Sequence, residues 1–110
     1  MTLKKLTEIL SCNSAWDGWE DREVSGGFTS DLLSDVMARA EDGDILITIQ
    51  AHKNTIAVAT LKDLAAILVA SSRPVPEDMI QAAKEEDIPI LVSADNQFDC
   101  SWKLHQALSE

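Results

Sequence analysis

A run of five β-branched and aliphatic residues, Ile45 to Ile49, constrains the fold more than any other feature of this sequence. The run is rich in β-branched residues and shows no alternation of polar and apolar positions. This pattern is typical of a strand buried on both faces of a parallel sheet. Parallel strands need long crossover connections, which are usually helices. A chain built around such a strand should therefore alternate strands with amphipathic helices.

The part of the chain before this run predicts two helices and a short strand. Apolar residues at helical spacing predict a helix over 3–10 with Thr2 as its N-cap, whereas 12–19 is typical of irregular structure. The segment 22–29 predicts a short strand that enters a tight turn at Gly26 and Gly27. A helix is expected to begin at Ser30 and to stop at Gly43. Its predicted buried face consists of Leu32, Leu33, Val36, Met37 and Ala40.

The segment Thr55 to Thr60 is compatible with two structures. Its β-branched residues favour a strand, which would form a hairpin with the preceding run. Asn54 as an N-cap and apolar residues at helical spacing favour a helix, which would form a βαβ crossover. We choose the helix because the remaining sequence continues the alternation. A strand at Ala66–Ala70, a helix at Pro76–Asp87, a strand at Ile90–Val92 and a helix at Asn96–Leu108 follow.

The predicted fold class is therefore α/β, a three-layer Rossmann-like fold with a mainly parallel sheet flanked by helices. Residues 1–110 are expected to form a single domain, because the chain is large enough for one core and too small for two.

Charge and cysteine content narrow the class of partner. The formal net charge of −10 disfavours binding to nucleic acid or to anionic membranes. No apolar stretch approaches the roughly 18 residues of a membrane span, and no signal peptide is visible. Cys12 and Cys100 are expected to be free thiols, which indicates a cytoplasmic protein.

The stretch from Asp21 to Met37, which contains Asp21-Arg22 and Gly26-Gly27, resembles the signature of the DRTGG domain family. Asp, Arg and both glycines of the family's motif occur in order, with a longer spacing. The resemblance continues through Gly43-Asp44 to Ile67 and covers nearly the whole chain. Such domains occur in CBS-containing pyrophosphatases, beside phosphotransacetylase domains, and as relatives of the N-terminal domain of HPr kinase/phosphorylase. The resemblance implies a Rossmann-like fold, a homodimer and a regulatory module without catalytic chemistry of its own.

The candidate ligand site lies at the carboxyl edge of the predicted sheet. In open α/β folds ligands bind at this edge, where helix N-termini present unpaired N–H groups. The loops there carry small hydrogen-bonding residues and two cations, a set that favours a phosphate or nucleotide. The predicted ligand-binding residues are Thr29, Ser30, Gln50, His52, Lys53, Asn54, Ser71, Arg73 and Ser93, with Ser72 beside them.

A second interpretation of the same residues needs no ligand. Ser, Asn and Asp cap helices and stabilise turns through local hydrogen bonds. Asp21 and Arg22 are likewise expected to hold a turn rather than to bind an anion. Under this alternative the chain is a purely structural protein–protein interaction domain. Trp16 and Trp19 then mark either an interface or a lid packed over the core.

Sequence features of an enzyme are sparse. His52 and His105 lie in no triad-like or zinc-binding pattern, and no Walker-type loop is present. Cys12 and Cys100 belong to no Cys-x-x-Cys pair, so neither a metal nor a cofactor is expected. A third hypothesis is an enzyme of unrecognised type that uses His52 as acid/base near Asn54 and Ser71. We therefore expect a regulatory or interaction module that acts on a partner protein.

Overall fold

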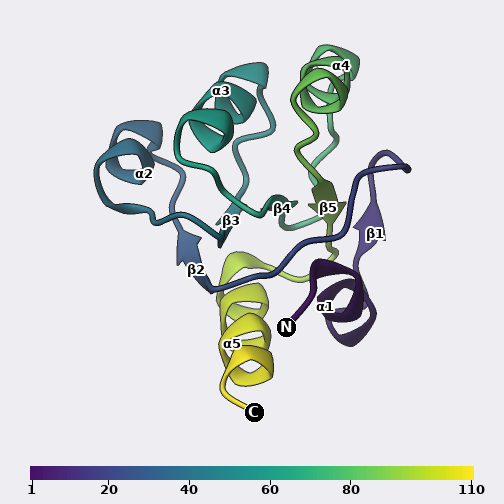
Figure 1. Ribbon diagram of the computed structural model, residues 1–110, viewed down its shortest axis with the longest axis vertical. Helices are drawn as coiled ribbons and strands as arrows, with labels where there is room; N and C mark the ends of the chain where they lie inside the picture. Colours follow the sequence, from purple (N-terminus) through teal and green to yellow (C-terminus); the bar gives the residue numbers. More distant parts are fainter.

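A five-stranded sheet in the order β1-β5-β4-β3-β2 forms the centre of the computed structural model, which describes residues 1–110 (Figure 1). The neighbours among β2 to β5 are parallel, and β1 pairs with β5 in the antiparallel direction. The strands are β1 (Asn13–Ser14), β2 (Gly26–Thr29), β3 (Asp44–Thr48), β4 (Ala66–Val69) and β5 (Ile90–Val92).

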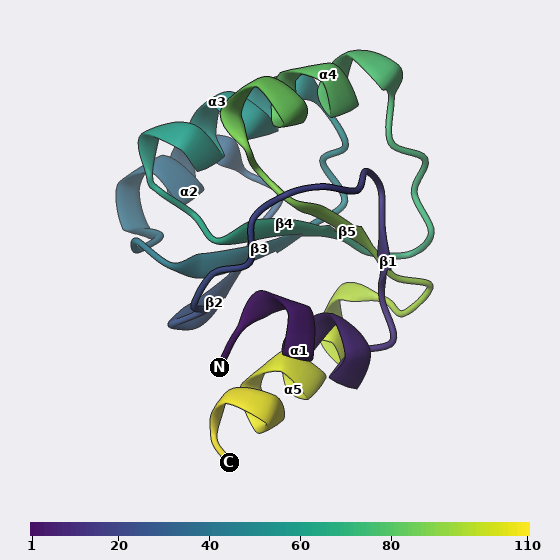
Figure 2. The same ribbon diagram turned by 45° about the vertical axis from the view of Figure 1, so that its right-hand side comes forward.

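Helices cover both faces of the sheet, so the molecule has three layers (Figure 2). One layer consists of α2 (Leu33–Arg39), α3 (Lys53–Leu61) and α4 (Glu77–Glu86); the opposite layer consists of α1 (Leu3–Ile9) and α5 (Gln97–Leu108). Two apolar cores result, one on each face of the sheet. The predicted α/β class with a mainly parallel sheet is confirmed.

β3 shows why the apolar run determined so much. Ile45 and Ile47 pack into the core beneath α1 and α5, while Leu46 packs into the core beneath the other three helices. Every residue of β3 is buried. A strand covered on both faces needs apolar residues at consecutive positions, which is the pattern in the sequence.

The ambiguous segment is helical, as predicted. α3 connects the parallel neighbours β3 and β4, and Thr55, Ile56 and Ala59 are its buried residues. The predicted cap is wrong: the His52 Nδ1 atom accepts a hydrogen bond from the backbone N–H of Asn54 at 3.0 Å. Asn54 therefore lies in the first turn, because the helix begins two residues earlier than an N-cap at Asn54 predicted.

Gly26 and Gly27 lie inside β2 and do not form the predicted turn. Neither has a positive φ. Close approach of neighbouring side chains explains the glycine pair: a Cβ on Gly27 would lie 2.7 Å from Leu104 Cδ2, and one on Gly26 would lie 2.8 Å from Asp44 Oδ1. These positions need glycine because α5 and Asp44 approach the strand closely.

Two further expectations need correction. Residues 12–19 contain β1, whose two residues are too few to show a strand pattern; Asn13 lies opposite Val92 of β5.

In α2 only Val36 is fully buried, while Met37 is partly exposed and Leu32 is 64% exposed at the N-cap position. Leu32 precedes the helix, so its side chain does not follow the helical face.

Candidate functional site

The carboxyl ends of β2 to β5 meet at one edge of the sheet, because these strands are parallel. All of the predicted ligand-binding residues follow or end these strands, so the topology gathers them along this edge. Their individual contacts differ, however, and many are made within the chain.

The segments after β4 and β5 diverge, since α4 and α5 lie on opposite faces of the sheet (Figure 2). Such a divergence is where open α/β sheets form a ligand crevice. Here two main-chain hydrogen bonds bridge it. Ser71 N–H donates to Asp95 O at 2.7 Å, and Ser72 N–H donates to Ser93 O at 2.9 Å. The loop after β4 is therefore tied to the loop after β5.

Strained backbone accompanies this bridge. Ser71 and Ser72 have φ values of 60° and 52°, in the left-handed region that favours glycine. Each such residue costs on the order of 1 kcal/mol. Ser93 lies beneath them at 5% exposure, and its Oγ accepts from the Asp95 N–H at 3.1 Å. Ser93 thus shapes the loop.

Three other predicted residues form local or intramolecular hydrogen bonds. Ser30 Oγ accepts from the Leu32 N–H at 3.1 Å, and Thr29 Oγ1 lies 2.7 Å from Ser101 Oγ of α5. His52 caps α3 as described above. Capping is thus the observed role of His52, while Asn54 presents an exposed side chain in the first turn.

Asp31 also lies at the carboxyl edge of the sheet, and it was not among the residues predicted from the sequence. Its Oδ1 atom accepts three hydrogen bonds: from Thr48 Oγ1 at 2.9 Å, from the Ile49 N–H at 2.8 Å and from Gln97 Nε2 at 3.0 Å. The carboxylate thereby joins the loop after β2, the end of β3 and the start of α5. An acidic residue at the second position of the helix predicted from Ser30 was visible in the sequence, but its three hydrogen-bond partners were not.

Lys53, Arg73 and Gln50 have exposed side chains at this edge. Neither cation forms an ion pair. Lys53 begins α3, whose first turn contains no acidic residue, whereas α4 begins with Glu77 and Asp78. The positive end of the α3 dipole and Lys53 therefore favour an anion there.

No single cavity gathers the predicted residues. Lys53 and Asn54 line a groove of about 400 Å³ between α3 and α4. Thr29 lines a different cavity, between β2 and α5. Ser71, Arg73 and Ser93 line none of the five cavities. The carboxyl edge is an open surface rather than an enclosed pocket.

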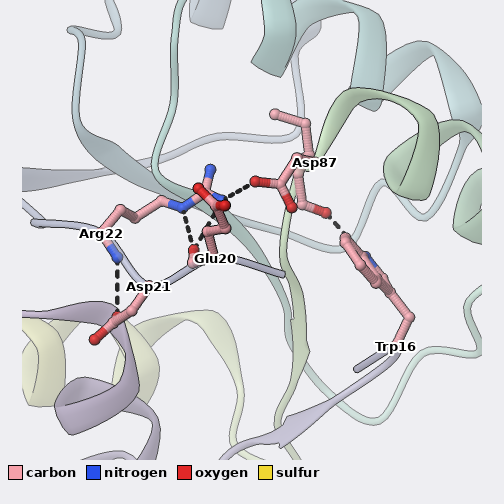
Figure 3. Close-up of polar contacts among 6 residues, drawn as sticks. Trp16, Glu20, Asp21, Arg22 and Asp87 are labelled. Atoms are coloured by element: carbon pink, nitrogen blue, oxygen red, sulfur yellow. Dashed lines mark hydrogen bonds and ion pairs between the residues drawn. The ribbon is translucent and has the colours of Figure 1, made fainter. Parts of the chain in front are cut away.

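The Asp-Arg pair lies at the opposite, amino edge, where Figure 3 shows its contacts. Arg22 donates through Nε and Nη2 to Glu20 O at 3.0 and 2.9 Å, and Nη2 also donates to Asp87 Oδ2 at 2.7 Å. Asp21 Oδ1 accepts from the N–H groups of Lys4 and Arg22, both at 2.9 Å. The Lys4 hydrogen bond is the largest cause that lowers the pKa of Asp21. Asp21 thus holds the segment before β2 to α1, and Arg22 holds the same segment to the turn before β5.

The tryptophans divide between core and surface. Trp16 Nε1 donates to Ile88 O at 3.0 Å (Figure 3), and Trp19 Nε1 donates to Ser14 Oγ at 2.8 Å. Both rings pack against the cores, so this segment forms a lid. Trp102 and Phe98, one turn apart on α5, are 59% and 79% exposed.

Cys12 and Cys100 are free thiols. Burial raises the pKa of Cys12 to about 12, with a smaller contribution from Cys100. No group of three His, Cys, Asp or Glu side chains is arranged to hold a metal ion. No helix has the length and apolar content needed to cross a membrane.

The sheet order and the two helical layers define a three-layer α/β domain. The sequence model of the DRTGG domain family matches residues 20–107, and the chain belongs to this family. No curated protein sequence matches the chain.

A crystal structure with the same fold comes from Clostridium perfringens. It contains the CBS and DRTGG domains of the regulatory region of a pyrophosphatase, complexed with the activator diadenosine tetraphosphate. The TM-score is 0.73 at 15% sequence identity, over 96% of this chain and 46% of the other. The present chain therefore spans less than half of the length of that regulatory region.

Proposed function

We propose that this chain is a non-catalytic regulatory module that binds a small anionic effector of the phosphate or nucleotide type at the carboxyl edge of its sheet. The observation that carries the proposal is the pair Lys53 and Arg73, two cations without ion pairs at one edge of a chain with net charge −10. Most of the molecular surface repels an anion, so an unpaired cation at the start of α3 is the favourable place.

The family supports the regulatory part of this proposal. The Clostridium perfringens regulatory region that shares the fold binds a nucleotide activator. Its DRTGG domain belongs to a regulatory region, and we assign the present chain a comparable role on a partner protein in the cytoplasm. In such a module the effector shifts the balance between two states of the assembly.

The strained Ser71–Ser72 bridge supplies a means of response. An anion at Arg73 contacts the loop that carries both left-handed serines, and this loop is bonded to the start of the α5 segment through Asp95 and Ser93. A ligand that moves the loop would therefore move the junction between β5 and α5 as well.

The test is a thermal-shift screen with inorganic phosphate, AMP, ATP and diadenosine tetraphosphate. A ligand at a hundredfold excess over its Kd adds roughly 2.7 kcal/mol of stability, which corresponds to several degrees in Tm for a domain of this size. The shift should disappear in the double variant Lys53→Gln/Arg73→Gln and persist in Lys84→Gln, which removes an exposed lysine from α4. Equal shifts in the double variant and the wild type would refute the site.

A second candidate function is self-association through α5. Phe98 and Trp102 form an exposed apolar pair on one helix face, and large exposed aromatics at such positions are typical of interfaces. We propose a second copy of the chain as the partner. Phe98→Ser/Trp102→Ser should abolish a dimer in sedimentation experiments, whereas Leu61→Ser, at a 70% exposed site on α3, should not. A monomer at high concentration in the wild type would rule out the homodimer.

A further inference from the structure

A cavity of about 360 Å³ lies between the edge strand β2 and α5. Figure 1 shows the two elements side by side at one end of the sheet. A cavity of this volume falls in the range of small-molecule sites. It is separate from the open surface around Lys53 and Arg73, neither of which lines it.

The lining of this cavity carries no Lys, Arg, Asp or Glu. Each of the other four cavities has at least one such residue in its lining. In a chain with 28 such residues (9 Lys and Arg plus 19 Asp and Glu), this contrast separates the β2–α5 cavity from the others. His105 is the one titratable side chain in this lining, and no permanently charged side chain is present to pair with an ion, so the lining favours an uncharged ligand.

Hydroxyl groups at the rim act as acceptors. Ser101 Oγ donates its hydrogen to Gln97 O at 2.6 Å, so Thr29 must be the donor in the 2.7 Å contact between the two hydroxyls. Ser109 Oγ donates to His105 O at 2.7 Å. The hydrogens of Thr29, Ser101 and Ser109 are therefore committed within the protein. The oxygens of Thr29 and Ser109, and the remaining lone pair of Ser101 Oγ, can accept from a ligand N–H or O–H.

The other walls offer an apolar surface and a strand edge. Ile47 and Leu104 are buried and line the cavity. β2 is the last strand of the sheet, so one side of its backbone has no strand partner. Its outer N–H and C=O groups can pair with the edge of a flat ring, as they would pair with another strand. Gly26 and Gly27 both line the cavity, and Gly27 is exposed.

We propose that this cavity binds an uncharged nucleoside or nucleobase. The ring would lie against Ile47 and Leu104, its polar edge would pair with the β2 backbone, and its amine or hydroxyl hydrogens would bond to the rim hydroxyls. An extended peptide fits less well, because β2 has only four residues. The proposal concerns a second site and does not depend on the anion site at the carboxyl edge.

The test is a ¹H–¹⁵N NMR titration of the chain with adenosine, guanosine, cytidine and uridine in separate experiments. We expect one or more of these probes to shift the amide signals of Gly26, Gly27, Ser101 and His105. Ser101→Leu and Leu108→Trp, which fill the cavity, should each weaken binding at least tenfold in a folded protein. Ser34→Leu, a serine change on the exposed surface of α2, should leave the Kd unchanged.

Two further measurements distinguish this site from the anion site. Nucleoside binding should be retained in Lys53→Gln/Arg73→Gln, and its Kd should not change between about 50 and 500 mM NaCl, because screening acts on charges. The proposal is overturned if none of the four probes shifts these amides at 10 mM, or if both cavity-filling variants bind as the wild type does. It is also overturned if the Gly26 and Gly27 amides of the Phe98→Ser/Trp102→Ser variant shift with protein concentration alone, which would identify a second copy as the occupant of the cavity.

Discussion

Replacing Asp31 by alanine is expected to destabilise the fold more than an acidic residue in a surface loop normally does. One oxygen of the carboxylate accepts three hydrogen bonds. The donors are the Thr48 hydroxyl, the Ile49 backbone N–H and the Gln97 side-chain amide. Thr48, one of these donors, is fully buried. In Asp31→Ala its hydroxyl hydrogen and the Ile49 N–H both lose their partner.

The size of the effect follows from these contacts. A buried donor left without a partner costs about 1–3 kcal/mol, and a part-buried hydrogen bond contributes about 1 kcal/mol. We therefore expect a loss of about 2–4 kcal/mol in the free energy of unfolding. Asp31→Asn retains a carbonyl oxygen at the same place, so it should lose only about 1 kcal/mol through the missing charge.

The assay is equilibrium unfolding in urea, monitored by circular dichroism and tryptophan fluorescence. The m-value, the slope of the free energy of unfolding against urea concentration, should be the same in every variant. Asp42→Ala provides the matched control, since Asp42 is exposed and its side chain makes no hydrogen bond or ion pair. The reasoning is refuted if Asp31→Ala costs no more than Asp42→Ala, or if alanine and asparagine at position 31 are equivalent.

Three further predictions follow from individual contacts. Gly27→Ala places a methyl group 2.7 Å from Leu104 Cδ2 and should cost about 1–3 kcal/mol in urea unfolding, and Leu104→Ala in the same chain should remove part of that cost. The Lys4 N–H lowers the pKa of the Asp21 carboxyl in the folded state. The Asp21 carboxylate therefore stabilises the fold above its unfolded pKa, and this stabilisation is lost as pH falls through its folded pKa. Asp21→Asn should make the free energy of unfolding less dependent on pH in the acid range. The pKa of Cys12 is raised from 9.0 to about 12, so stability should fall as pH rises above 9.0, and iodoacetamide at pH 8 should label native Cys12 far more slowly than the unfolded chain.

The elements that local patterns define were predicted well. The strands at 45–49, 66–70 and 90–92 and the helices at 76–87 and 96–108 agree with the structure to within one residue at each end. Continuous apolar runs and amphipathic spacing are properties of short segments, and both report burial directly. The choice of a helix at 55–60 came from the alternation of elements rather than from the segment, whose β-branched residues favour a strand.

The candidate site was predicted less completely. Its location at the carboxyl edge follows from the parallel sheet, and the cations Lys53 and Arg73 lie there unpaired. The same residue types that hydrogen-bond a ligand also cap helices, so the sequence could not show that His52 would cap α3. Asp31 was missed because its importance resides in three partners, two of which lie 17 and 18 residues away and one 66 residues away.

The sequence by itself determined the fold class, the order of the strands and helices other than β1, and the family, because each depends on hydrophobic periodicity or on residues close together in the chain. Only the tertiary structure decided the pairing of β1 with β5, the reason for the two glycines and the cavity between β2 and α5. The β1–β5 pairing, the contact of Gly27 with Leu104 and the cavity bring together segments separated by about 70 to 80 residues, whereas Gly26 meets Asp44 of the neighbouring strand. Close contact between such segments depends on how the layers pack, and no local pattern of side chains encodes that distance.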